Sequence, residues 1–232
     1  MKTISAFARR RERDFRTVFH NRRDAGKRLA ALLAHTAGSH GAVALALPRG
    51  GVPVAYEIAT AFRIPLDVFE VRKLGAPGQS ELAMGAIGSG GAVYLNEQVI
   101  EALGVSRSFV RELAQRERSE LKRREALYRE GRGPAAVGGR RVLLVDDGIA
   151  TGATMQAAVK ALRAKDPAAI TVAVPVAPAQ AIVELRAVAD EVVCAITPGS
   201  FYAVGSWYHD FRQVDDGEVH DLLRLAAMRS AG

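Results

Sequence analysis

Short apolar runs alternate with helical segments along most of this chain, and that alternation limits the folds open to it. The strand candidates are continuous apolar stretches at 43–47, 65–71, 141–145, 170–176 and 191–196. Continuous apolar strands are typical of sheets that are buried on both faces, whereas half-exposed strands alternate with polar residues. The pattern therefore predicts an α/β fold in which a parallel sheet is flanked by helices.

Size and composition favour a single domain spanning 1–232, because 49% of the residues are hydrophobic and can form a substantial core. No run approaches the ~20 apolar residues that cross a bilayer, and no apolar segment follows the N-terminal arginines as in a secretory signal. The lone Cys194 excludes an intramolecular disulfide, and no Cys/His cluster suggests a zinc site. We expect a cytoplasmic protein with no membrane partner.

The net charge of +7 has two interpretations. A positive protein attracts anions, including phosphorylated metabolites and nucleic acid. Most of the excess, however, lies in 9–28 and 107–132, which look helical and mixed in sign, so a solvated basic surface is favoured. Nucleic acid is therefore an unlikely partner.

Several segments depart from the alternation. Residues 7–36 have the spacing of a helical arm, and the Gly- and Ser-rich stretch 75–91 is typical of a long mobile loop, with a hairpin as one option. Residues 106–130 carry a thin apolar stripe among many charges, which predicts a helix that packs on a neighbour or on the partner of a homodimer. This helix belongs to an insertion at 97–132, and a linker at 131–139 follows it.

The most informative segment is the strand at 141–145, which ends in Asp146 and Asp147 and continues through a Thr-Gly loop into a helix. Ligands of open α/β sheets lie beyond the carboxyl ends of strands. Loop amides and a helix N-terminus suit a phosphate, while paired carboxylates accept hydrogen bonds from neighbouring ribose hydroxyls and attract a divalent cation. An ordinary polar turn is the alternative for Asp-Asp-Gly alone. The glycine patterns of P-loop and dinucleotide-binding proteins do not occur here.

Residues Val142 to Thr154 resemble the phosphoribosyl-diphosphate motif of type I phosphoribosyltransferases: four apolar residues, two acids and a Thr-Gly-x-Thr loop. The resemblance implies that Asp146 and Asp147 hold the ribose hydroxyls. The 5-phosphate would be wrapped by Ala150, Thr151, Gly152, Ala153 and Thr154. We expect Mg2+ as the cofactor, held by the two acids mainly through ligand hydroxyls and water. Gly148 replaces the usual branched aliphatic residue and should loosen the loop.

Two further segments extend the resemblance over roughly 40–210. Arg49, Gly50 and Gly51 follow the first strand and are similar to the family's diphosphate-binding loop, which would place a cis peptide at Arg49-Gly50. An arginine and glycine amides at a strand end can also bind an anion on physical grounds. Arg72 and Lys73 are similar to the basic pair that opens the mobile catalytic loop of adenine phosphoribosyltransferases. We expect both to bind phosphoribosyl diphosphate and to offset the negative charge of its diphosphate.

The whole chain resembles a bacterial group of predicted phosphoribosyltransferases whose acceptor is uncertain. The segments that carry this resemblance are 21–26, 48–53 and 72–86. The resemblance covers the N-terminal segment as well as the motifs above, but it does not identify the acceptor.

The acceptor side of the site is expected at 197–215, which with the N-terminal arm is the candidate hood. Flat aromatic rings can stack on a nucleobase, and Tyr202 and Val204 are similar to an acceptor-binding stretch of hypoxanthine-guanine enzymes. Those enzymes carry an acid where this chain has Ala150, so no base is assigned. Glu81 and Asp210 are candidate catalytic residues for proton transfer, or else surface carboxylates.

These observations predict a phosphoribosyltransferase that moves ribose 5-phosphate from phosphoribosyl diphosphate to a small nitrogen acceptor and releases diphosphate. The alternative is a regulator that senses the same sugar diphosphate and binds nucleic acid. A third possibility is an interaction protein in which the helix at 106–130 joins subunits. In the first two cases we expect the carboxylates of Asp146 and Asp147 to be exposed at the strand end.

Overall fold

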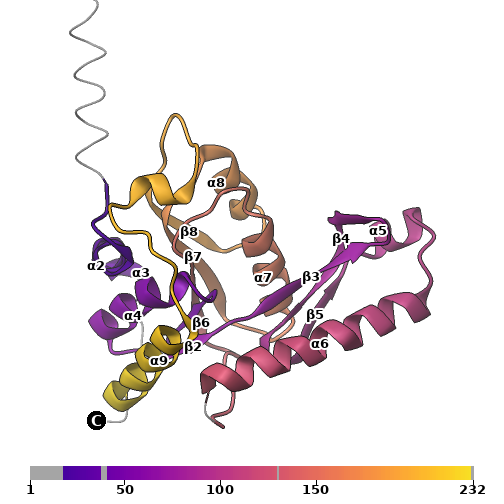
Figure 1. The fold of residues 1–232 in the computed structure, drawn as a ribbon, viewed down its shortest axis with the longest axis horizontal. Helices are drawn as coiled ribbons and strands as arrows, with labels where there is room; N and C mark the ends of the chain where they lie inside the picture. The colour runs from indigo at the N-terminus through magenta and orange to yellow at the C-terminus, as the bar shows by residue number, and fades with distance from the viewer. Residues whose placement is uncertain (1–17, 38–40, 130, 231–232) are drawn as a thin grey trace, which may run out of the picture.

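A parallel five-stranded sheet forms the centre of the molecule in a computed structural model that describes residues 18–37, 41–129 and 131–230 (Figure 1). Its spatial order is β2–β1–β6–β7–β8, and each neighbouring pair is parallel. The bounds are β1 Val43–Ala46, β2 Leu66–Val68, β6 Arg141–Val145, β7 Ala169–Val176 and β8 Glu191–Ile196. The predicted α/β fold with a parallel sheet is confirmed.

Helices cover both faces of this sheet, which explains why its inner strands are apolar throughout. The helices are α2 Arg22–Leu32, α3 Ala34–Ala37, α4 Gly51–Phe62, α7 Ala153–Arg163, α8 Ala179–Arg186 and α9 Asp216–Ser230. Alternate residues of β6 face opposite ways: Leu143 and Val145 join a core with α2, α4 and α9, whereas Val142 and Leu144 join one with α7 and α8. Both cores exclude water, so each strand residue contributes to the hydrophobic stabilisation.

A second, antiparallel sheet contains most of the segment that we expected to be a mobile loop. Its strands β3 Val71–Ala76, β4 Gln79–Gly88 and β5 Ala92–Leu95 are ordered β3–β4–β5, with the short helix η1 Ser89–Gly91 before β5. The prediction of a long mobile loop at 75–91 is therefore wrong, whereas the hairpin that we kept as an option is present. Here glycine serves close packing: a Cβ on Gly85 would lie 2.3 Å from the carbonyl oxygen of Tyr94, and one on Gly88 2.5 Å from the Phe69 ring. The predicted strand at 65–71 is also divided, between β2 and β3.

The predicted helix at 106–130 forms as α6 Arg107–Arg129, after α5 Glu97–Ala102. Figure 1 shows α5, α6 and the antiparallel sheet extending together away from the parallel sheet. Val110 and Leu121 of the stripe are buried against the antiparallel sheet, whereas Leu127 is 53% exposed. The helix thus packs on its own chain.

The buried guanidinium of Arg129 joins the end of α6 to the parallel sheet. Its Nε lies 2.9 Å from Oδ1 of Asp67 on β2, and its Nη2 donates to the carbonyl of Val68. Asp67 also accepts a hydrogen bond from the backbone N–H of Ala135 beyond the helix. Across the part of the chain that the structure describes, no helix combines the length and apolarity required to cross a membrane.

Candidate active site

The acid pair lies directly beyond β6 and is partly covered. The carboxylate of Asp147 is only 15% exposed and accepts a 2.7 Å hydrogen bond from Nε of Arg22, while Oδ1 of Asp146 accepts one from the backbone N–H of Asp147. Our expectation of two exposed carboxylates is wrong, because α2 and the segment after β8 pack around them.

Electrostatics make this pair receptive to a cation or to hydrogen-bond donors. Burial, together with the charge of Asp147, raises the pKa of Asp146 well above its usual range. Burial also raises the pKa of Asp147, although the adjacent Arg22 guanidinium opposes the shift. Two neighbouring carboxylates in a partly dry setting are costly to ionise together, so a ligand that brings hydroxyl donors or a divalent cation relieves that cost.

The loop after β1 lies against the acid pair, because β1 and β6 are neighbours in the sheet. A Cβ on Gly50 would be 2.0 Å from Oδ2 of Asp147, and one on Gly51 would be 3.0 Å from Cα of Asp146. Only glycine allows this approach. The cis peptide of this loop is at Pro48-Arg49 and not at Arg49-Gly50 as expected. The Arg49 guanidinium is 3.8 Å from a carboxylate oxygen of Asp216.

The Thr-Gly loop leads into α7 in the way a phosphate site requires. Gly152 has φ +80° and precedes the first residue of the helix. Ala150, Thr151, Ala153 and Thr154 are exposed around it. The first-turn amides of a helix lack intrahelical partners and carry partial positive charge, so an anion can bind there.

A pocket of about 200 Å³ opens between this loop and the antiparallel sheet. Thr151 and Ala153 line one side and Lys73 of β3 the other, together with Tyr94 and Lys160. Arg72 does not reach it: successive strand residues face opposite ways, and Nε of Arg72 donates to a carboxylate oxygen of Glu117 on α6 at 2.8 Å. The alternation of side chains along β3 thus brings only one member of the predicted basic pair to the pocket.

Lys160 was missed by sequence reasoning. Its ammonium group is 5.1 Å from the centroid of the Tyr94 ring and borders the pocket. The available signal was helical spacing, because Ala153, Gln156 and Lys160 fall on one face of α7, at positions i, i+3 and i+7 from the end of the Thr-Gly loop.

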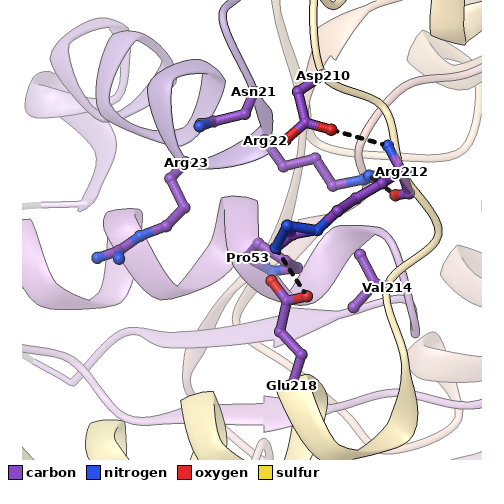
Figure 2. Close-up of a pocket in the computed structure, with 8 residues that line it drawn as sticks. All are labelled: Asn21, Arg22, Arg23, Pro53, Asp210, Arg212, Val214 and Glu218. Carbon is purple, nitrogen blue, oxygen red and sulfur yellow. Dashed lines mark hydrogen bonds and ion pairs between the residues drawn. The ribbon is translucent and has the colours of Figure 1, made fainter.

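The segment after β8 contributes unevenly to the site. Val204, in the short helix η2 Val204–Trp207, packs on Gly148: a Cβ on that glycine would lie 2.5 Å from Cγ1 of Val204. Gly148 therefore makes room for Val204, and a branched residue would collide with it. Tyr202 is 95% exposed and does not border any of the pockets described. Asp210 accepts a hydrogen bond from the backbone N–H of Arg212 and borders a small polar pocket of about 100 Å³ (Figure 2).

Two other predicted parts of the acceptor side are described only in part by the structure. Glu81 lies in β4, but its side chain is outside the described residues. Of the N-terminal arm, residues 7–17 are also outside them, whereas Phe19 pairs with Tyr208 and exchanges backbone hydrogen bonds with Trp207 and His209. The start of the described chain and the segment after β8 are therefore neighbours.

Arg22 is the second residue that sequence reasoning missed. The burial of Arg22 could have been predicted from the sequence. Arg22, Ala25, Gly26 and Leu29 recur at helical spacing, which places the arginine on the buried face of α2. Its partner in the fold, Asp147, was not predictable from that spacing.

The family model for the phosphoribosyl transferase domain matches residues 86–212, which is more than half of the chain. The chain belongs to the phosphoribosyl transferase family. The matched range contains β6, the acid pair, the Thr-Gly loop and the segment up to Arg212. The match therefore includes the acid pair and the Thr-Gly loop, whereas Arg22, the glycine loop after β1 and Lys73 lie before it.

Relatives within the phosphoribosyl transferase family support this assignment. Two Mycobacterium tuberculosis proteins, from strains CDC 1551 / Oshkosh and H37Rv, are 45% identical over 209 residues and are named "Putative phosphoribosyl transferase" MT0597 and Rv0571c. The alignments cover 90% of this chain but 47% of each relative, so the chain spans about half their length. The crystal structure of TT1426 from Thermus thermophilus is 45% identical, with a TM-score of 0.82 over 89% of this chain and 97% of that one.

Proposed function

We propose that this chain transfers ribose 5-phosphate from phosphoribosyl diphosphate to a nitrogen acceptor, such as a nucleobase, and releases diphosphate. The observation that supports this most is the meeting of two elements at the carboxyl ends of adjacent strands. Glycines 50 and 51 after β1 lie against Asp146 and Asp147 after β6, and the Thr-Gly loop follows directly. This arrangement offers separate places for a diphosphate, a diol and a phosphate.

In this proposal the ribose hydroxyls donate hydrogen bonds to the carboxylates of Asp146 and Asp147. The 5-phosphate binds the amides and hydroxyls from Ala150 to Thr154, with the ammonium group of Lys73 across the pocket. The diphosphate lies at the glycine loop near the Arg49 guanidinium. Each part of the donor thus meets groups of suitable charge or hydrogen-bonding capacity.

Mg2+ fits these residues only as a cation shared with the donor. Two carboxylates supply hard oxygen ligands, but Mg2+ takes six, and the described residues contain no group of three or more metal-ligating side chains. Oxygens of the donor and water would complete the set around Asp146 and Asp147. When bound, the cation would neutralise charge that develops on the diphosphate.

The chemical step breaks the bond between C1 of the ribose and the diphosphate oxygen, whose electron pair leaves with the diphosphate. The acceptor nitrogen forms the new bond at C1 and loses a proton. Arg49 and the amides of Gly50 and Gly51 offset the charge that grows on the leaving group. Asp210 and Glu81 are the candidates to take the proton, and Val204 the candidate to contact the acceptor.

The test is release of diphosphate from phosphoribosyl diphosphate with Mg2+ and a panel of nucleobases and other nitrogen acceptors. We expect turnover with at least one acceptor. The double variant Asp146→Asn, Asp147→Asn should lose about 100-fold or more of it while keeping its circular dichroism spectrum. Asp221→Asn, an exposed acid on α9, is the control. Tight donor binding without turnover on any acceptor would reject the transferase and leave the regulator.

A second candidate function, a phosphoribosyl-diphosphate-sensing regulator that binds nucleic acid, is favoured by one surface. Arg111, Arg118 and Lys122 are exposed at i, i+7 and i+11 along α6, beside β5. Within the described ranges none of the three forms an ion pair with a carboxylate. The test is a gel-shift assay with DNA or RNA on the wild type and on the triple variant Arg111→Glu, Arg118→Glu, Lys122→Glu. Binding that weakens as salt is added, and that is lost in the triple variant, would support this function. Binding that persists in that variant would contradict it.

A further inference from the structure

The Arg22 side chain bridges the donor and acceptor sides of the site. It starts in the first turn of α2, is 9% exposed, and uses separate parts of its guanidinium for separate partners. Nε donates to Oδ2 of Asp147 at 2.7 Å, and Nη1 donates to the carbonyl oxygen of Arg212 at 2.8 Å. Figure 2 shows the side chain extending from α2 to the Arg212 backbone, beside Asp210.

The bond to Asp147 leaves part of that carboxylate for a ligand. Arg22 bonds Oδ2, and no other described residue donates a hydrogen bond to Oδ1. A partly buried carboxylate without a cationic partner is energetically costly to keep ionised. Without Arg22, the Asp147 side chain would also be able to rotate. The Nε bond holds Oδ2 in place and supplies the charge, and the guanidinium is itself held by its second bond to the Arg212 carbonyl. By holding Oδ2, Arg22 restricts the directions in which Oδ1 can point.

The bond to Arg212 ties down the segment that follows β8. The guanidinium carbon also lies 3.9 Å from the centroid of the Phe211 ring, so the arginine holds this segment by a hydrogen bond and by stacking. A third contact comes from the other direction, since the hydroxyl of Tyr208 donates to the backbone carbonyl of Asp147. Residues 208–212 are thus attached to the acid pair at two points.

We propose that Arg22 is a positioning residue that orients Asp147 toward the ribose hydroxyls of the donor and holds residues 208–212 in place beside it. The inference rests on the proposed function for its donor half, since it assumes that Asp147 contacts the donor. In this proposal the Arg22 guanidinium connects Asp147, on the donor side, with residues 208–212, on the acceptor side.

Two substitutions separate the two roles. Lysine keeps a positive charge near Asp147, but its single ammonium group cannot also reach the Arg212 carbonyl and stack on Phe211. Methionine removes the charge and every hydrogen bond. Arg22→Lys should therefore keep the donor role in part and lose the hold on 208–212, whereas Arg22→Met should lose both.

The experiment measures two quantities on the intact chain. Calorimetry with phosphoribosyl diphosphate and Mg2+ gives the donor Kd. Acrylamide quenching of Trp207, the one tryptophan of the chain, reports on the segment without any ligand. We expect Arg22→Met to weaken donor binding by about 50-fold and Arg22→Lys by less than about ten-fold. Both variants should show stronger Trp207 quenching than the wild type.

Arg163→Met is the matched control. That arginine also bonds a carboxylate and a backbone carbonyl, those of Asp190 and Val188, but it lies at the far end of α7. It should move neither readout. Unchanged Trp207 quenching in Arg22→Met, or donor binding equal to wild type in that variant, would overturn the inference. Failure of the wild type to bind the donor would instead reject the proposed function, and the quenching comparison would still test the link to 208–212.

Discussion

The absence of a Cβ atom at Gly50 and Gly51 allows the loop after β1 to approach the acid pair closely. The site has room for backbone at Gly50 but none for a side chain, since a Cβ there would overlap the Asp147 carboxylate. Gly51 and Gly148 meet the same limit against Val145 and Val204. These glycines thus permit the close contacts of the site because they have no side chain.

Gly50→Ala should displace the Asp147 carboxylate and weaken donor binding by about ten-fold or more, since a shift of this kind costs a charged hydrogen bond. Donor Kd by calorimetry is the measurement. Gly133→Ala is the control, because a Cβ there would have no neighbour within 4 Å. Equal affinity of the two variants would show that the close approach of Gly50 has no role in binding.

Glu70, between β2 and β3, provides a test of pH dependence. Burial raises the pKa of its carboxyl, although Arg124 at 3.7 Å opposes the shift. The folded chain then holds this proton to a higher pH than the unfolded chain does, so the contribution of Glu70 to stability falls as pH rises through that window.

Glu70→Gln mimics the protonated form at every pH. The unfolding free energy of this variant relative to wild type should therefore increase with pH above the pKa of an ordinary glutamate. Urea denaturation over a pH series, with Glu112→Gln at an exposed position of α6 as the comparison, measures the difference. A difference that does not vary with pH would contradict the raised pKa.

At the scale of elements, α6 is attached to the parallel sheet by the ion pair of Arg129 and Asp67, both largely buried. Removing one member of such a pair leaves the other charge unpaired. Arg129→Met should lower the unfolding free energy by about 3–5 kcal/mol. Arg123→Met breaks the exposed pair with Glu120 and should cost far less, because solvent screens a pair of this kind. Similar losses in urea denaturation would place the Arg129 pair among ordinary surface contacts.

The alternation of β3 makes a second prediction at this scale. Lys73 borders the pocket at the Thr-Gly loop, while Arg72 turns to Glu117 on α6. Lys73→Met should weaken donor binding by about ten-fold, and Arg72→Met should leave it within about two-fold. Calorimetry distinguishes them, and an equal effect of the two variants would mean that both side chains act on the donor.

At the scale of the whole molecule, a donor that binds only the folded chain must stabilise it. At 100 times its Kd the gain is about 2.7 kcal/mol, which is readily detected as a rise in the melting temperature. Phosphoribosyl diphosphate with Mg2+ should produce this rise in the wild type. The variant with Asn at positions 146 and 147 should show none, and a rise in that variant would place the donor elsewhere.

Local patterns were sufficient for much of this fold. The apolar runs at 43–47 and 141–145 predicted β1 and β6, because a strand covered on both faces must exclude polar residues along its whole length. The helix predicted after the Thr-Gly loop forms as α7. The acid pair and the Thr-Gly loop were also visible, since they directly follow a predicted strand.

The glycine-rich stretch at 75–91 was predicted less well, because local patterns favoured a loop and offered a hairpin only as an option. Its composition is typical of a loop, yet it forms β3 and β4, because Leu74 and Ile87 are buried against Leu121 of α6. That contact joins residues more than thirty positions apart in the sequence. Strand formation there depends on a partner surface that no local pattern contains.

The sequence by itself thus determined which segments become strands of the parallel sheet and where the Thr-Gly loop lies, because both follow from the order of apolar and polar residues over a few positions. Only the tertiary structure decided that Arg22 meets Asp147, that Arg72 turns away from the pocket, and that Gly148 receives Val204. Arg22 and Asp147 are 125 positions apart, and their contact exists only because packing of α2 on the sheet brings the two side chains together.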